Sequence, residues 1–235
     1  MKLSKSYIFL LLVLLTTEIG CSDLNLFGKK KIKEGVILYN ITYLEESKDN
    51  PLIALLPTSM NMLFKSNNSV VKIEGFMGLF SFYYITLNHE CFNSTVLRIF
   101  DKTYEYKIDC GKPAFGYQNM GELSITKLEE TVNIAGLDCK RAKITIKGEK
   151  TLEFFVAYTD IIDIDKPNQN NPFIGIDGVL MEFQVNLNGI GMKFTAQSVT
   201  ESPVSDEEFK LPQNCNAVDF KKMEELMGSF SSKPK

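Results

Sequence analysis

Cys21 is the residue whose position in this sequence predicts a chemical modification. It directly follows Gly20, and the segment before it begins with Lys2 and Lys5 and contains an apolar stretch at residues 7–15. A basic start, a short apolar stretch and a small residue before the cleavage point are typical of a secretory signal peptide. A cysteine directly after the small residue predicts a lipoprotein signal. In such a signal the thiol receives a diacylglycerol, and cleavage leaves Cys21 as the first residue of the mature chain.

The apolar stretch is too short to cross a membrane as a helix, because its nine residues would reach only about 14 Å. We therefore predict a signal peptide at residues 1–20 and a mature protein anchored to the membrane by the lipid on Cys21. We expect it in a bacterial cell envelope, on the outer membrane and facing the periplasm. Leu15 lies six positions before Cys21, whereas lipoprotein signals usually carry an aliphatic residue three positions before the cysteine. An ordinary secretory signal therefore remains an alternative. Ser22 and Asp23, which follow the cysteine, do not settle which membrane or leaflet receives the protein, so an inner-membrane location also remains open.

Four further cysteines could form disulfides after export: Cys91, Cys110, Cys139 and Cys215. Cys91 and Cys110 flank a hairpin that we predict at residues 95–108, with its turn at 101–102. In that register the two cysteines come within about one residue of facing each other, so a slipped register or a bulge would allow a disulfide between them. The other two cysteines are then a second candidate pair. Each of the four could instead be a small buried hydrophobic residue.

The sequence offers little for catalysis. His89 is the only histidine, and it follows a predicted strand. The motifs G-x-S-x-G, H-E-x-x-H and G-x-G-x-x-G do not occur, so hydrolase, zinc-protease and nucleotide-binding sites lack their local geometry. We expect no catalytic residue and no cofactor. An enzyme would need at least two polar side chains to converge in one cleft, drawn from Asp160, Asp163, His89 and Cys139.

Metal binding is not expected either. An EF-hand loop beginning at Asp163 would need Gly at its sixth position and Glu at its twelfth, but Asn168 and Ile174 stand there. A zinc site lacks its ligand spacing, because the chain has no C-x-x-C motif and a single histidine.

The charge of the mature chain argues against a nucleic-acid partner. Removal of residues 1–20 lowers the basic count from 26 to 24 and the acidic count from 29 to 28, for a net charge of −4. The hydrophobic content of 44% indicates a folded protein. About 200 residues suffice for one substantial core, and 17 Phe and 9 Tyr residues without Trp suggest a β-rich interior.

The elements that must position these residues are mostly strands, because apolar and polar residues alternate with a period of two. The first strand places Ile37, Tyr39, Ile41 and Tyr43 on one face. We expect ten or eleven antiparallel strands, at residues 36–44, 59–65, 70–75, 79–87, 95–100, 103–108, 124–128, 140–147, 151–158, 179–187 and 192–198.

Helices are predicted only as short segments. Residues 51–56 follow capping residues and begin with Pro, and 204–209 resemble a helical turn. Residues 218–227 carry apolar side chains at spacings of three and four, which is typical of an amphipathic helix.

A sheet of this many strands must curl or close, and its concave face must then be filled by side chains, a ligand or a helix. We therefore predict a mainly β fold, either a single large curved antiparallel sheet or an incomplete β-barrel, with the short helices as a plug or lid. The predicted organisation is a lipidated tether at 21–34, one β-rich domain at 35–228 and a polar tail at 229–235.

Two stretches resemble a known family. Residues 134–143 are similar to the I-x-G-y-x-C-x-K-A strand of the GLPGLI and related lipoproteins of Bacteroidetes, a family of unknown function. Residues 171–181 resemble the G-L-P-G-L-I turn that names the family, with Asp177 in place of Pro, Val179 in place of Leu and Leu180 in place of Ile. Glycines in these stretches, Gly136, Gly175 and Gly178, are predicted to allow tight turns into strands.

The resemblance continues at both ends of the domain. Residues 35–39 are similar to the family's opening strand and 206–212 to its closing turn, so the likeness spans about 35–212. Such domains resemble the LolA/LolB class of lipoprotein carriers in turn. That resemblance implies an incomplete barrel whose hollow binds acyl chains beneath a helical lid.

Two functions follow as hypotheses. In the first, a cell-envelope lipoprotein binds an acyl chain or another hydrophobic ligand in the concave face of its sheet. In the second, a structural or assembly lipoprotein has a filled core and binds envelope proteins, which exposed Met and Phe side chains on the 218–227 helix would favour.

Overall fold

The computed structural model describes residues 30–44, 56–75, 80–109, 111–117, 120–148, 151–187 and 190–231, without the side chains of 229–231. Apart from Lys30, these residues belong to one compact unit that begins at Lys31. Several predicted features lie outside the described residues: the signal peptide, Cys21, Cys110, most of the tether and most of the helix predicted at 51–56.

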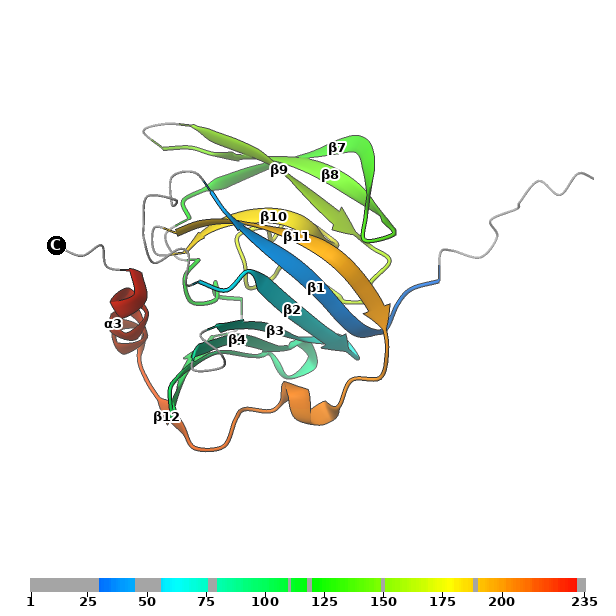
Figure 1. Ribbon diagram of the computed structural model, residues 1–235. Coiled ribbons are helices and arrows are strands. Elements are labelled where there is room, and N and C mark those ends of the chain that lie inside the picture. The colour runs from blue at the N-terminus through cyan, green and yellow to red at the C-terminus, as the bar shows by residue number, and fades with distance from the viewer. Residues whose placement is uncertain are drawn as a thin grey trace, which may run out of the picture. The chain divides into compact units, whose positions relative to one another are not determined.

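The described residues form one sheet of twelve strands and a C-terminal helix (Figure 1). The elements are β1 (Glu34–Tyr43), β2 (Ser59–Lys65), β3 (Asn68–Gly75), β4 (Phe80–Leu87), β5 (Phe92–Ile99), β6 (Lys102–Ile108), β7 (Leu123–Ile134), β8 (Leu137–Ile146), β9 (Leu152–Thr159), β10 (Val179–Leu187), β11 (Ile190–Glu201), β12 (Cys215–Ala217) and α3 (Phe220–Ser231). Their order across the sheet is β12-β6-β5-β4-β3-β2-β1-β11-β10-β9-β8-β7. The sheet does not close into a barrel, so the predicted fold class is confirmed.

Each of the eleven predicted strands corresponds to a strand of the sheet, although several strands begin or end up to three residues from the predicted bounds. Three larger or unexpected differences follow. β12 was not predicted, and it pairs in parallel with β6, whereas the other neighbouring strands are antiparallel. β7 continues to Ile134, because residues 129–133 are mostly polar and exposed and give no apolar alternation to recognise. The β5–β6 turn lies at Phe100 and Asp101, one residue earlier than expected, since Ile99 pairs with Lys102.

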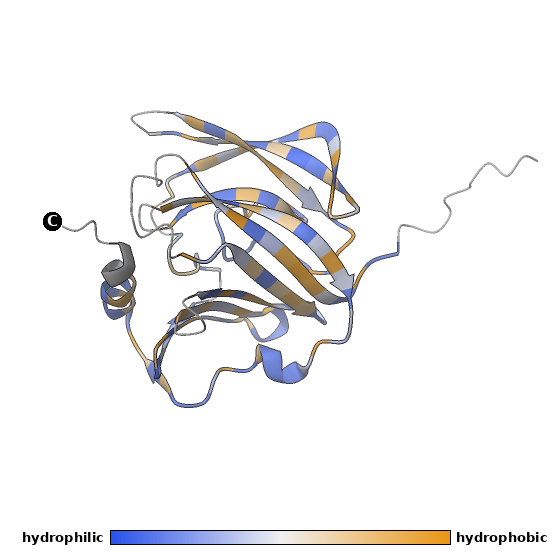
Figure 2. Ribbon diagram, in the orientation of Figure 1, coloured by the Kyte–Doolittle hydropathy of each residue, from blue (hydrophilic) through white to orange (hydrophobic). Residues whose placement is uncertain are grey.

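Alternation of apolar and polar residues builds the strands (Figure 2). In β1, Ile37, Tyr39 and Ile41 are buried on the concave face, as predicted, and the residues between them are more exposed. Three pairs of strands contain register irregularities, among them β1 with β11 next to Tyr39. Such bulges bend strands and increase their twist. They let this sheet curve around its own apolar side chains.

The main core fills the concave side of the sheet. Buried side chains of β1 and β2 join those of β8 to β11 and of the segment 160–178 in a single apolar cluster. The segment before β1 is attached to the same unit, because Ile32 forms a parallel bridge with Ile162.

The convex face of β2 to β5 is covered by residues 202–214, which we call the strap. Val204 and Phe209 of the strap pack against Val70, Ile85 and Val96. Burial on both faces explains why these strands are apolar on both sides. The strap carries the chain from the end of β11 to β12 (Figure 1).

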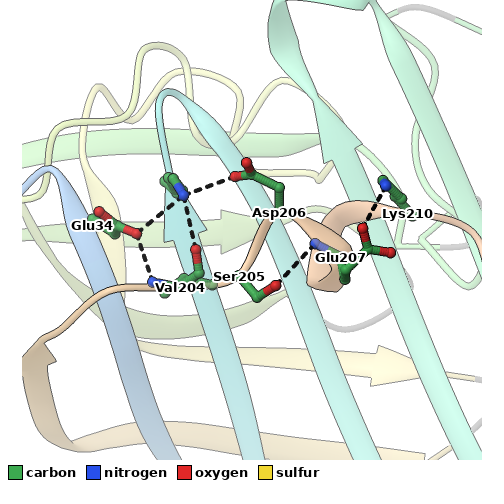
Figure 3. A network of polar contacts seen from close by, with 7 residues as sticks. Glu34, Val204, Ser205, Asp206, Glu207 and Lys210 are labelled. Atoms are coloured by element: carbon green, nitrogen blue, oxygen red, sulfur yellow. Dashed lines mark hydrogen bonds and ion pairs between the residues drawn. The ribbon is translucent and has the colours of Figure 1, made fainter.

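A network of polar contacts holds the strap near the start of β1 and the end of β2 (Figure 3). Lys65 Nζ lies 2.8 Å from Asp206 Oδ1 and 3.4 Å from Glu34 Oε1, and it donates to the carbonyl of Val204 at 2.9 Å. The same Glu34 oxygen accepts a hydrogen bond from the Val204 backbone N–H at 2.6 Å. The Lys65 ammonium therefore links three chain segments.

The predicted amphipathic helix is present as α3, and its apolar face is covered. Met223 is fully buried, and Phe220, Leu226 and Met227 are half-buried against a cluster that contains Phe82 and Phe115 of the sheet region. The exposed Met and Phe side chains that would favour a protein partner are not found on the described part of this helix.

Gly178 marks a place where two strands meet closely. A Cβ at this position would lie 2.6 Å from the carbonyl oxygen of Thr159, at the end of β9. Gly178 is therefore required for close approach of the backbones at the start of β10. Gly136, in contrast, has a φ of +80° in the β7–β8 turn, as the turn prediction requires.

We expect Gly178→Ala to lower the free energy of unfolding by about 2 kcal/mol or more, because the added methyl group overlaps a fixed backbone oxygen. Urea denaturation measures the change. The control is Gly228→Ala in α3, where nothing lies within 4 Å of the added Cβ. It should be neutral or stabilise by up to about 1 kcal/mol. Equal effects of the two substitutions would contradict this account of Gly178.

Candidate functional site

A cavity lies on the concave side of the sheet, between β1 to β4 and β10 to β11. It offers about 110 Å³ of space to water-sized molecules. One water molecule needs only about 10–15 Å³ by this kind of measure, so the cavity holds more than a single solvent molecule. Most of its lining is apolar or aromatic, with Val71, Phe173, Phe183 and Leu187 among the side chains. We call it the concave cavity.

Strand register brings the wall of the concave cavity together. Met62 of β2 pairs with Val71 of β3, and Val71 pairs with Tyr84 of β4. Directly paired residues point to the same face of a sheet. These three side chains therefore form a row across three strands, and all three line the cavity.

Three tyrosines in the wall are held neutral. The Tyr39 hydroxyl donates to the carbonyl of Leu180 at 2.8 Å, and the Tyr84 hydroxyl donates to that of Phe115 at 2.5 Å. Burial raises the pKa of Tyr39 and Tyr84 well above the ordinary value and raises the pKa of Tyr117 to about 12. Near neutral pH these hydroxyls are un-ionised, so none is a ready base or nucleophile.

The segment 160–178 forms the remaining wall of the concave cavity, and asparagine side chains hold this segment in place. Asn168 Nδ2 donates to the carbonyls of Ile176 at 2.8 Å and Gly178 at 2.9 Å, and its Oδ1 accepts from Asn171 Nδ2 at 3.0 Å. Asn171 Oδ1 accepts from the Phe173 backbone N–H at 2.9 Å. Both side chains line the cavity, and their hydrogen bonds are directed into the segment itself.

Asn170 differs from its neighbours. Its Nδ2 donates to Asn93 Oδ1, but its own Oδ1 is buried without a hydrogen-bond partner, and so is Asn93 Nδ2. Asn170 is 9% exposed and lines the concave cavity, whereas Asn93 is 2% exposed and does not. Two buried polar atoms of this amide pair therefore lack a hydrogen-bond partner.

No charged side chain is found among the described residues that line the concave cavity. Its polar contribution comes from neutral hydroxyls and amides. Such a lining suits an uncharged molecule with a large apolar part.

The residues that could support an enzyme are only partly brought together. His89 and Asp163 line one surface groove with Lys65 and Asp165. Asp163 pairs with Lys31 at 3.4 Å, and the His89 ring forms no hydrogen bond or ion pair with the described residues. The groove therefore has no histidine oriented by an acid.

The other two of these residues lie elsewhere. Asp160 pairs with Lys140 at 3.0 Å, which lowers the pKa of the carboxyl through a hydrogen bond, and Cys139 is buried in the core. No group of three His, Cys, Asp or Glu side chains that could hold a metal ion is found in the part of the chain that the structure describes.

Sequence reasoning missed the residues that shape the cavity. Tyr84, Asn168 and Asn170 were not predicted as site residues. The run Asn168-Gln-Asn-Asn171 was the available signal, because asparagine side chains often hydrogen-bond to their own loop.

Comparison with protein-family models finds no matching family, and a search of curated proteins finds no match. The resemblance to the GLPGLI and LolA/LolB families stays a prediction. Within the described residues, no helix is both long enough and apolar enough to span a membrane.

The cysteines have different states. Cys91 is disulfide-bonded, and because Cys110 lies outside the described residues, their pairing stays a prediction. Cys139 and Cys215 are free thiols, so the second candidate pair is wrong. Cys139 is fully buried, as expected for a small hydrophobic residue, and burial raises its pKa to about 11.

We expect iodoacetamide at pH 8 to label Cys215 at least about tenfold faster than Cys139, because Cys139 is buried and almost wholly protonated. Peptide mass spectrometry locates the label. In urea the two rates should become similar. Equal rates in the folded protein would show that Cys139 is accessible.

Proposed function

We propose that this protein is a cell-envelope lipoprotein that binds an acyl chain or another hydrophobic molecule in the concave cavity. The observation that carries the proposal is an uncharged, largely apolar cavity of about 110 Å³ within the main core.

The cavity supports ligand binding because protein interiors are normally close-packed. Side chains around an unfilled apolar space lose contacts that a ligand can restore. Water gains little there, since most of the lining offers it no hydrogen bond. An apolar molecule is therefore the occupant that this wall favours most.

A binding role also fits the chemistry of the wall better than a catalytic role. The tyrosine hydroxyls are un-ionised, and those of Tyr39 and Tyr84 donate to backbone carbonyls. Among the described residues of the lining, no ionised group could move a proton or attack a substrate at neutral pH. The proposal therefore assigns no reaction to this site.

The lipid anchor proposed on Cys21 would hold the binding cavity near a membrane. A lipid on Cys21 would leave ten residues, 21–30, before the compact unit, and ten extended residues span at most about 35 Å. The cavity would then stay close to the bilayer, which suits the receipt of a hydrophobic molecule better than its transport through solution. The resemblance to acyl-chain carriers supports the same role.

The alternative, an assembly protein that binds envelope proteins, has lost the observation that would favour it. Exposed Met and Phe side chains on the 218–227 helix would have favoured it, but the described apolar side chains of this helix pack against the sheet region.

We expect the purified protein to give a saturable rise in diphenylhexatriene fluorescence, because this hydrocarbon probe emits strongly in an apolar site. Val71→Trp should weaken binding at least about tenfold, since the larger side chain fills part of the cavity. The matched control is Val132→Trp on β7, where the side chain is 38% exposed and lies outside the cavity lining. The control should bind within about twofold of the unmodified protein.

Two results would count against ligand binding. One is the absence of a saturable signal with the unmodified protein. The other is an equal loss of affinity in Val71→Trp and Val132→Trp, which would place the probe outside the concave cavity.

We expect Cys21→Ser to move the protein from the membrane fraction to the soluble fraction, because the acylated thiol is lost. Intact-mass spectrometry should detect the diacylglycerol on the unmodified protein alone. Cys215→Ser serves as the control and should remain in the membrane fraction. Membrane association of Cys21→Ser, with a mature N-terminus at another residue, would refute the lipid anchor.

A further inference from the structure

We propose that the concave cavity binds an uncharged molecule through a planar aromatic ring, which inserts between two groups of aromatic side chains. This inference rests on the proposed function and specifies its ligand class.

Six aromatic side chains line the concave cavity, and their mutual contacts divide them into two groups. The first group is Tyr39, Phe173, Phe183 and Phe194, and the second is Tyr84 and Tyr117. No charged side chain is found among the described residues of the lining, so a charged ligand ring would lose its hydration without gaining a counter-ion.

Phe183 is the centre of the first group. Its ring stacks on that of Phe194, with the centroids 4.9 Å apart and the planes inclined by 10°. The rings of Tyr39 and Phe173 make edge-to-face contacts with Phe183, at centroid distances of 6.1 Å and 6.3 Å. Both arrangements are favoured between aromatic rings. The first group is therefore a preformed aromatic wall.

Tyr84 and Tyr117 form a second wall. Their rings are stacked, with the centroids 5.9 Å apart and the planes inclined by 19°. Tyr84 lies on β4 and Phe183 on β10, and four strands separate β4 from β10 in the sheet, namely β3, β2, β1 and β11. Among the described residues, no ring of the first group contacts a ring of the second. The cavity therefore has aromatic walls on two sides that do not touch.

An aromatic ligand gains more from these walls than a saturated one. An aromatic ring has a negative face and a positive edge, so two rings attract each other beyond the effect of buried area. A saturated group gains only from the removal of its surface from water and from dispersion. A ring that contacts both groups makes the aromatic contacts on two sides.

The size of the cavity also favours a ring over a long chain. An engineered apolar cavity of about 150 Å³ binds benzene. The concave cavity, with about 110 Å³ of space for water-sized molecules, is of the same order. A long acyl chain would leave most of its carbon atoms outside the space that the described residues line.

Displacement of diphenylhexatriene at pH 7 tests the inference, with 4-ethylphenol and 4-ethylcyclohexanol as competitors. The two compounds share one carbon skeleton and carry one hydroxyl each, but only the phenol has a planar aromatic ring. Both are uncharged, because a phenol ionises well above neutral pH. We expect 4-ethylphenol to bind at least about fivefold more tightly than 4-ethylcyclohexanol.

Phe183→Leu should weaken 4-ethylphenol binding about fivefold, because the central ring of the first group is lost, and should leave 4-ethylcyclohexanol within about twofold. The matched control is Phe209→Leu in the strap. The two phenylalanines are equally buried, at 9% and 8% exposed, but Phe209 does not line the cavity. This control should bind both competitors within about twofold of the unmodified protein. An equal loss of 4-ethylphenol binding in the two variants would overturn the inference.

Failure of this inference can be told apart from failure of the proposed function. If the unmodified protein does not bind diphenylhexatriene, hydrophobic ligand binding is refuted and the inference falls with it. If it binds the probe but 4-ethylphenol competes no better than 4-ethylcyclohexanol, only the inference about the ligand is refuted. The comparison of the two competitors needs no variant, so it remains decisive even if Phe183→Leu does not fold.

Discussion

The pairing of β1 with β11 holds the two halves of the sheet together. On one side β1 continues through β2 into β3 to β6, and on the other side β11 continues into β10 to β7. Without this pair the protein would be two separate sheets, each with an apolar face exposed to water. With it, one bent surface encloses its own apolar side chains, and the segment 160–178 can reach across them.

The cavity is a consequence of this geometry. An open sheet that bends without closing has an inner face whose curvature is set by its bulges and by the side chains that cover it. Large rings such as Phe173 and Phe183 occupy part of the space, while shorter side chains such as Val71 leave a gap between them. The segment 160–178 closes one side of the cavity, and the side chains of Asn168 and Asn171 form hydrogen bonds within this segment. The result is a largely apolar cavity whose described lining carries only neutral polar groups.

The sequence predicts the strands well because alternation is a local signal, visible in Ile37, Tyr39 and Ile41 without knowledge of any partner. The curvature follows from the number of strands, since a long twisted sheet cannot stay flat. β12 is different, because Cys215-Asn216-Ala217 has no alternation and becomes a strand only beside β6. The candidate site could not be predicted from the sequence either. Asn93 and Asn170 are 77 positions apart, and neither residue type signals that the other is near.

The position of the last strand has a consequence for biosynthesis. β11 and β12 come near the C-terminus, yet they complete the centre and one edge of the sheet. A nascent chain cannot form these pairings until residues 190–217 have left the ribosome. Contacts this distant in sequence also form slowly. Such a topology therefore delays assembly of the sheet until these late strands are available to pair.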